Sequence, residues 1–309
     1  MAFPRNIEVI KKDFCNTLED VAGRHRPYEI FHDWLEMAAI SLHQMPYHAG
    51  DFSKDETFQN LEEKYLEVAG KYNREELTEI AKLMGLTIEA LHTKPHDFLG
   101  DIYQEMEFSN PKSGQFFTPF PVSQMMAKMN MADVANKIQE KGIITVSDPA
   151  CGAGGTLIAA ALEVENQEID PRQVLQFEAI DIDRDCFNMA YIQLSSLDLQ
   201  AMVCHGHSLL RREIWEERAT PQLMYFNQWR SQQQESLLAE ERINKMLGLM
   251  RDLEQPSPEE ESPTETVQER VQESESKAVS EPTPKSKPEA DIVFEPQQLS
   301  LFDTRQFEQ

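Results

Sequence analysis

The spacing of apolar residues predicts a helical N-terminal region. Between residues 28 and 42, apolar side chains recur every three or four positions, which places them on one face of a helix. Residues 75–91 repeat the pattern. We therefore expect residues 1–110 to form helices whose apolar faces serve packing rather than chemistry. The predicted buried positions are Phe31, Trp34, Leu35, Ala38, Ala39 and Leu42 in the first stretch, and Leu77, Ile80, Ala81, Met84 and Leu91 in the second.

The middle of the chain changes to alternating strand and helix patterns. Short apolar runs that start at Ile143, Gln176 and Ala201 each predict a strand, and a helical pattern follows the first two. Strands that alternate with helices form parallel sheets. Residues 230–253 then predict a long helix with one apolar side. We expect an α/β domain over residues 111–254.

The last part of the chain has the composition of a disordered acidic tail. Residues 255–291 are rich in Pro, Glu, Ser, Thr and Gln, and they contain no Gly and no aromatic residue. Such a sequence cannot bury enough apolar surface to offset the entropy lost on ordering, so a disordered linker is expected. Apolar residues return in the C-terminal peptide, residues 292–309.

The composition indicates which partners the chain can bind and where in the cell it is expected. The chain has 54 acidic and 29 basic residues and a formal net charge of −25. DNA affinity comes largely from Lys and Arg that neutralise phosphates, so tight non-specific DNA binding by this chain alone is disfavoured. No long apolar run or signal-peptide core occurs, which predicts a cytoplasmic protein without a membrane partner. The four scattered cysteines predict neither disulfides nor a metal site.

The clearest chemical signal lies between the first predicted strand and its helix. The segment 148–156 reads Asp-Pro-Ala-Cys-Gly-Ala-Gly-Gly-Thr, and glycines at such a turn let the backbone approach a ligand closely. Its glycine spacing differs from the GxGxxG of dinucleotide dehydrogenases. Asp181 ends the next strand, with Asp183 two residues on, and a carboxylate there can bind two ribose hydroxyls. A solvated acidic turn is the alternative, but the order of elements favours a nucleoside site.

These residues resemble a known family, the adenine-N6 DNA methyltransferases, and especially the modification subunits of type I restriction systems. Segment 148–156 resembles their first motif, and 178–183 resembles their acidic second motif. Gly114-Gln-Phe-Phe-Thr-Pro119 resembles their GQFYTP motif, preceded by the usual lead-in helix at 97–106. The resemblance covers about residues 28–210. It implies a Rossmann-like S-adenosylmethionine-dependent methyltransferase fold, with S-adenosylmethionine as the cofactor.

The resemblance also implies which residues contact the cofactor. The glycine turn would hold its methionine part and Asp181 its ribose, while Phe117 and Thr118 close the other side. The third motif, usually Gly-Asp with the acid on the adenine amine, reads Gly-His-Ser at residues 206–208, which departs from the family pattern. The implied cofactor contacts are Phe117, Thr118, Asp148, Cys151, Gly152, Gly154, Asp181, Asp183, His207 and Ser208.

A larger departure concerns catalysis. The family motif Asn-Pro-Pro-aromatic, which binds the target amine and stacks on the flipped base, occurs nowhere in the chain. The nearest candidate is a strand at residues 223–226 followed by Asn227 and Trp229. Too few residues follow the third strand for the complete sheet, so we expect a truncated fold. Its first strand would have an exposed edge unless residues 223–226 or another subunit cover that edge.

The tail contains a second resemblance. Gln298-Leu299-Ser300-Leu301-Phe302 is similar to the short peptide by which polymerases and repair proteins bind the bacterial sliding clamp. The glutamine would form hydrogen bonds, while Leu301 and Phe302 would fill an apolar pocket. A terminal apolar patch that docks on its own domain is the alternative.

Two functions therefore remain open. The chain is either a site-specific adenine-N6 DNA methyltransferase completed by a partner subunit that supplies catalytic and DNA contacts, or a non-catalytic cofactor-binding protein recruited to replication sites through the clamp. The missing catalytic motif leaves open whether the chain is an enzyme. A homo-oligomer is a further way to cover the exposed strand edge.

Overall fold

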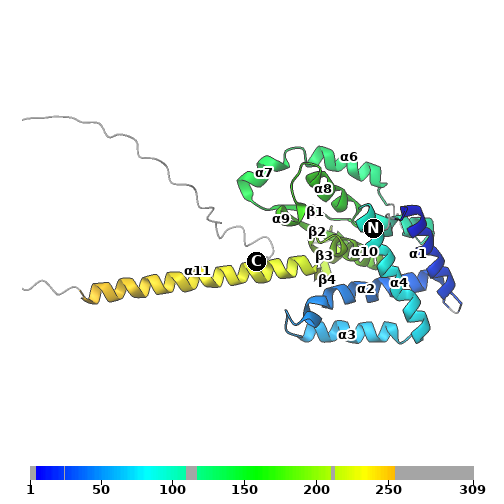
Figure 1. Ribbon diagram of the computed structural model, residues 1–309, viewed down its shortest axis with the longest axis horizontal. Helices are drawn as coiled ribbons and strands as arrows, with labels where there is room; N and C mark the ends of the chain where they lie inside the picture. The colour runs from blue at the N-terminus through cyan, green and yellow to red at the C-terminus, as the bar shows by residue number, and fades with distance from the viewer. Residues whose placement is uncertain (1–4, 24, 109–116, 210–212, 255–309) are drawn as a thin grey trace, which may run out of the picture. The chain divides into compact units, whose positions relative to one another are not determined.

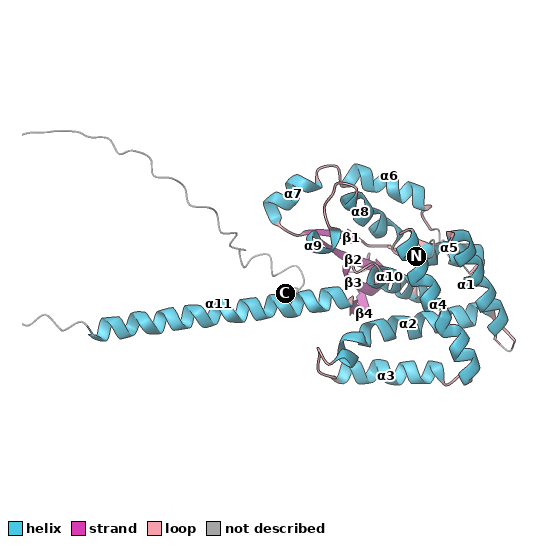
Figure 2. Ribbon diagram, in the orientation of Figure 1, coloured by secondary structure: helices cyan, strands magenta, loops and turns pink. Residues whose placement is uncertain are grey.

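The computed structural model describes residues 5–23, 25–108, 117–209 and 213–254 (Figures 1 and 2). Helices and strands alternate after an all-helical N-terminal part. In chain order the elements are α1 Ile7–Val21, α2 Pro27–Ala49, α3 Glu56–Ala69, α4 Arg74–Thr93, α5 Phe98–Glu105, α6 Phe120–Asn130, α7 Val134–Lys141, β1 Ile144–Asp148, α8 Gly155–Glu165, α9 Pro171–Val174, β2 Leu175–Asp181, α10 Arg184–Ser196, β3 Gln200–His207, β4 Glu213–Ala219 and α11 Pro221–Glu254.

The N-terminal helices α1–α5 confirm the helical prediction, and their ends carry the expected signals. Asn73 accepts hydrogen bonds from the amides of Glu75 and Glu76, which caps α4. On the apolar face predicted for α2 every residue is buried except Leu42, which is half-buried. In α4 one predicted position is wrong: Ala81 is exposed, and Leu83 is buried in the core. The buried face of α4 differs from the predicted one because its residues, Ile80, Leu83, Thr87 and Leu91, recur every three or four positions.

The described strands form one sheet in the order β1-β2-β3-β4. The first three are parallel, as predicted, with Val146 level with Phe177 and Phe177 level with Ala201. β4 was not predicted, and it pairs antiparallel with β3. The strand expected at residues 223–226 is wrong, because these residues lie in the first turns of α11. Pro221 at the first helical position has a fixed φ that suits a helix start, and helix-forming residues follow it.

β1 forms one edge of this sheet. Among the described strands it pairs with β2 alone, so the backbone groups on its other side have no strand beside them. Thr145 and Ser147 of β1 are exposed. The expectation of an open first strand therefore agrees with the structure, whereas the covering strand proposed at residues 223–226 does not exist.

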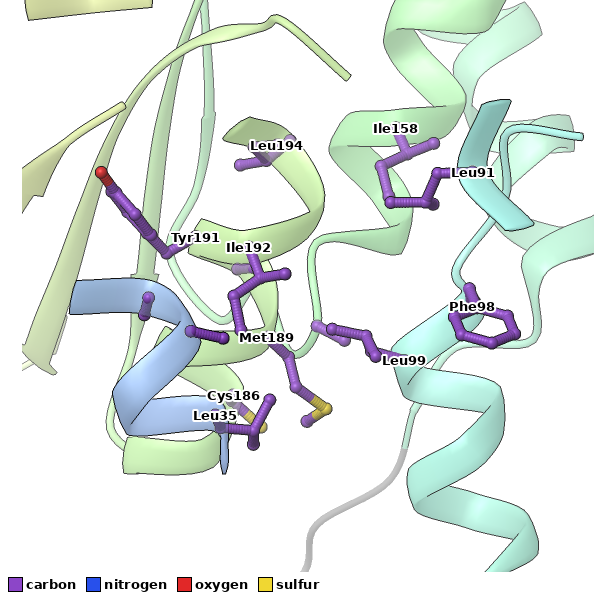
Figure 3. Close-up of a cluster of buried hydrophobic side chains, with 14 of the residues drawn as sticks. Leu35, Leu91, Phe98, Leu99, Ile158, Cys186, Met189, Tyr191, Ile192 and Leu194 are labelled. Atoms are coloured by element: carbon purple, nitrogen blue, oxygen red, sulfur yellow. The ribbon is translucent and has the colours of Figure 1, made fainter. Parts of the chain in front are cut away.

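The N-terminal helices and the sheet share one hydrophobic core. Phe14 of α1 packs edge-on against Trp34 of α2 and Phe98 of α5, with ring centroids 5.3 and 5.6 Å away. Figure 3 shows side chains from α2, α4, α5, α8 and α10 meeting around Met189. The same cluster continues through Phe177 to the sheet. The helices before residue 110 thus pack directly on the elements that present the glycine turn.

A buried ionic network also joins α2, α10 and β4. Arg184 donates to Glu36 from Nε and Nη2, at 2.9 and 2.6 Å, and it also pairs with Glu216. Lys64 lies 2.9 Å from Glu36. The buried Arg218 pairs with Glu216 and stacks over aromatic rings of α10. Burial alone would raise the pKa of Glu36, but the hydrogen bonds from Arg184 and Lys64 outweigh it and hold that pKa well below its usual range.

None of the helices in the described ranges is long and apolar enough to cross a membrane.

Candidate functional site

The glycine turn between β1 and α8 has a backbone that favours glycine. Gly152 and Gly154 have φ values of +55° and +91°, in the left-handed region. Gly155 lacks space for a side chain for a different reason, since a Cβ there would lie 2.8 Å from Oδ2 of Asp97. The turn can therefore start α8 close against α5.

Two carboxylates stabilise this turn by accepting hydrogen bonds. Asp148 at the end of β1 accepts from the Ala150 amide at 3.1 Å and from the Thr156 hydroxyl. Asp181 at the end of β2 accepts from the Gly152 amide at 2.8 Å and from the Asp183 amide at 2.9 Å, one bond to each oxygen. Burial raises the pKa of Asp181, and the two backbone hydrogen bonds oppose that shift. A carboxylate has about four acceptor positions, so Asp181 keeps capacity for further donors.

Asp183 and Asp185 have structural partners in this site. Asp183 is the N-cap of α10 and accepts from the Cys186 amide at 3.0 Å. Asp185 is buried, and it pairs with Nδ1 of His32 at 2.5 Å and accepts from the Tyr28 hydroxyl at 3.1 Å. The predicted cofactor contact Asp183 therefore also fixes the start of the helix.

An aromatic ring from the segment that precedes α6 lies next to the glycine turn. A Cβ added at Gly152 would lie 3.4 Å from ring carbons of Phe117, so the glycine keeps a gap open beside this ring. Phe117 packs against Tyr103 of α5, with ring centroids 5.5 Å apart. Thr118 is exposed next to it. The structure thus brings the predicted residues Phe117, Gly152 and Asp181 together, while residues 114–116 of the same motif lie outside the described residues.

A buried side-chain pair that the sequence did not predict holds the turn in place. Nε2 of Gln193 in α10 donates to Asp97 Oδ1 at 2.9 Å and to the carbonyl of Ala153 at 2.7 Å. Asp97 also accepts from the Gly100 amide at 3.0 Å, as the N-cap of α5. Burial raises the pKa of Asp97 to about 6. The signal available in the sequence was the position of Asp97 before an apolar helix, which indicates a cap but not this contact.

The third predicted motif lies at the end of β3. In register, Asp181 is level with His205, so His207 lies two residues further along β3. His207 and Ser208 are half-buried. His205, which the sequence analysis did not single out, packs edge-on against Trp215 of β4 at 5.0 Å, and its Nε2 lies 3.1 Å from the carbonyl of Ile182.

Cys151 is a buried thiol within the turn. Its amide donates to the carbonyl of Ile180 at 3.0 Å, which ties the turn to β2. Burial raises the pKa of the Cys151 thiol, so a neutral, unreactive side chain is favoured. Within the described ranges, no group of three or more His, Cys, Asp or Glu side chains could hold a metal ion.

The two residues considered for catalysis lie on a helix. Asn227 and Trp229 are exposed on α11, where Trp229 packs near Phe226 with ring centroids 5.8 Å apart. This part of α11 is anchored at the α2–α3 connection, because the Tyr225 hydroxyl donates to Asp51 at 2.6 Å. The interpretation of residues 223–229 as a strand ending in a catalytic loop is therefore wrong in its secondary structure.

A cavity of about 300 Å³ lies beside α2 rather than at the glycine turn. It is lined by His25, Tyr28, Glu29, His32, Asp33 and Lys71. Asp185, two residues after Asp183, binds the Tyr28 and His32 side chains of this cavity. We place the candidate site at the turn because the predicted residues converge there.

Comparison with known proteins identifies the family. A family model described as N-6 DNA Methylase matches residues 94–248, half of the chain, including the glycine turn, Asp181 and α10. The chain belongs to the N-6 DNA methylase family. Membership in this family implies that the cofactor is S-adenosylmethionine. No curated protein matches the chain.

Two solved structures are similar to this N-6 DNA methylase family member. One is a putative class I S-adenosylmethionine-dependent methyltransferase from Listeria monocytogenes, with 15% identity, 66% of this chain and 54% of that chain covered, and a TM-score of 0.37. The other is the methyltransferase subunit of a type I restriction-modification system from Streptococcus thermophilus, with 12% identity, 63% and 57% covered, and a TM-score of 0.32. The chain thus spans little more than half the length of each.

Proposed function

We propose that this member of the N-6 DNA methylase family binds S-adenosylmethionine at the glycine turn and takes part in DNA modification together with a partner subunit. One observation carries the proposal. The backbone of Gly152 donates to Asp181 on one side and keeps a gap beside Phe117 on the other. Residues of the first motif, the acidic second motif and the GQFYTP motif therefore meet at one place, which is where a nucleoside cofactor would lie in an open α/β sheet.

The residues present fit this cofactor in charge and shape. S-adenosylmethionine carries a sulfonium and an ammonium group, and Asp148 and Asp181 supply negative charge at the turn. Asp181 retains acceptor capacity for ribose hydroxyls. Ile182, directly after it, has a side chain that is 56% exposed, an apolar surface on which an adenine ring could pack. His207 and Ser208 would replace the acid that other members use for the adenine amine.

A partner subunit is proposed because the chain lacks groups that methyl transfer to adenine needs. Asn-Pro-Pro-aromatic is absent from the full sequence, and the formal charge of −25 disfavours DNA binding by this chain alone. The open edge of β1 is a surface that a partner's strand could extend. This subunit would supply the catalytic loop and most phosphate contacts.

Cofactor binding can be measured by isothermal titration calorimetry with the full chain. We expect saturable binding that Asp181→Asn weakens by about 10- to 100-fold, because hydrogen bonds to a charged group contribute about 1.5–3 kcal/mol each. The matched control, Asp20→Asn, changes an exposed carboxylate on α1 and should leave affinity unchanged. A wild-type chain that shows no binding at millimolar S-adenosylmethionine would contradict the proposal. Transfer of a labelled methyl group to unmethylated DNA by the isolated chain would contradict the need for a partner only.

A second candidate function rests on the peptide Gln298–Phe302, which lies outside the described residues. We propose it as a sliding-clamp ligand that would recruit a non-catalytic, cofactor-binding chain to replication sites. In a pull-down with a bacterial sliding clamp, Leu301→Ala with Phe302→Ala should abolish capture, because these side chains would fill the apolar pocket. Phe307→Ala, which changes an aromatic residue outside the motif, is the control. Undiminished capture of the double variant would show that the peptide is not a clamp ligand.

A further inference from the structure

Helix α11 exposes an apolar face that nothing in the described part of the chain covers. It is a single helix of 34 residues (Figure 1). Its first turns are anchored, with Leu223 and Met224 buried. From residue 231 to 246 every side chain is exposed, and Ile243 and Met246 are 58% and 64% exposed. Helices in water draw most of their stability from packing an apolar face, so a long helix of this kind needs a partner.

Part of the apolar surface of α11 follows the spacing of a coiled coil, while the exposed Leu237 and Leu238 lie beside this seam. A seam with alternating steps of three and four residues runs through Trp229, Gln232, Ser236, Ala239, Ile243 and Met246. Four of these six residues are apolar, and the last three, Ala239, Ile243 and Met246, are all apolar. This spacing favours another helix as the partner over a flat sheet surface or a globular pocket.

Between residues 231 and 251 the charges on α11 are separated into two blocks, which Arg230 precedes and Asp252 follows. Residues 231–241 contain three acids and no base: Glu235, Glu240 and Glu241. Residues 242–251 contain three bases and no acid: Arg242, Lys245 and Arg251. A second α11 that runs in the opposite direction would place each acidic block against a basic block. A parallel, in-register pair would place like charges side by side, which is unfavourable.

We propose that α11 is a self-association helix, which pairs antiparallel with α11 of a second copy and crosses it near Ile243. The partner is a second copy because the helix complements its own charge pattern when it is reversed. The antiparallel orientation also separates the two acidic bodies, since each chain carries a net charge of −25. This proposal does not rest on cofactor binding, so either can fail without the other.

Sedimentation equilibrium of the full chain tests the association. We expect twice the chain mass of 35.6 kDa. Ile243→Glu with Met246→Glu should raise the dissociation constant by at least about 100-fold, because four buried apolar side chains per dimer are lost. The control, Gln234→Glu with Asn244→Glu, adds the same charge away from the seam and should leave the dimer intact. A monomeric wild-type chain overturns the proposal, and so does a dimer that the seam variant leaves unchanged.

The charge blocks and the orientation have their own tests. Glu240→Lys with Glu241→Lys should weaken the dimer, and adding Arg242→Glu with Lys245→Glu should restore it. Spin labels on Ser231→Cys should lie about 36 Å apart in the antiparallel pair, from a rise of 1.5 Å per residue on each side of Ile243. They would lie about 10 Å apart in a parallel pair. A short label distance, or a dimer that the two lysines do not weaken, overturns the antiparallel arrangement.

Discussion

Glu36→Ala is expected to destabilise the fold by about 3–5 kcal/mol, the usual cost of removing one partner from a buried ionic network. The variant leaves Arg184 and the buried Arg218 close together, with Glu216 as their remaining carboxylate. Lys64 and Asn188 also lose a partner. Urea unfolding followed by circular dichroism would measure the change at neutral pH.

The pH dependence gives this prediction a specific sign. The folded state holds the pKa of Glu36 below its usual value of 4.5, so the carboxylate stabilises the fold above that pH. The difference between wild type and variant should therefore shrink as the pH falls below 4.5 toward the lowered pKa. Glu67→Ala, an exposed change on the neighbouring helix α3, should alter stability by less than about 0.5 kcal/mol. A loss under 1 kcal/mol for Glu36→Ala would show that the network adds little to stability.

Gly206→Ala is expected to cost about 3 kcal/mol or more, because the antiparallel strand β4 lies too close to Gly206 of β3 for any side chain there. A Cβ at residue 206 would lie 2.4 Å from the carbonyl oxygen of Glu213 and 2.8 Å from Cα of Ile214. Both are backbone atoms, so the antiparallel pairing itself must shift. Thermal or urea unfolding would report the loss.

For Gly85→Ala, by contrast, we expect the stability of the fold to increase. A Cβ at Gly85 would meet nothing within 4 Å, and the residue lies inside α4. Alanine should stabilise the helix by up to about 1 kcal/mol.

If Gly206→Ala unfolds at the same urea concentration as wild type, the close packing of β4 against residue 206 is contradicted.

The parallel strands and the residues of the glycine turn could be predicted from the sequence because their signals are local. A short apolar run, a glycine-rich turn and an acid at the next strand end follow one another within the chain. β4 escaped prediction because it has charged residues where a buried strand usually has apolar ones. Its inward side chain, Arg218, is buried through pairing with Glu216 rather than by being apolar.

Two further differences between the prediction and the structure arise because local sequence patterns do not determine them. Leu-Met-Tyr-Phe at residues 223–226 has the composition of a buried strand, and a short apolar run does not distinguish a strand from a helix. The contact between Asp97 and Gln193 joins residues 96 positions apart, so only the packing of α5 on α10 creates it. The sequence therefore predicted the residues that form the glycine turn better than the residues that hold it in place.

If S-adenosylmethionine binds at the glycine turn as proposed, the unpaired side of β1 has an energetic consequence for it. A strand that paired with β1 along its full length would end beside Asp148, whose carboxylate accepts hydrogen bonds within the glycine turn. If the added strand and S-adenosylmethionine both favour the same turn conformation, each raises the affinity for the other by the same factor. Under the proposed function, loading with the methyl donor would then act as a signal for assembly.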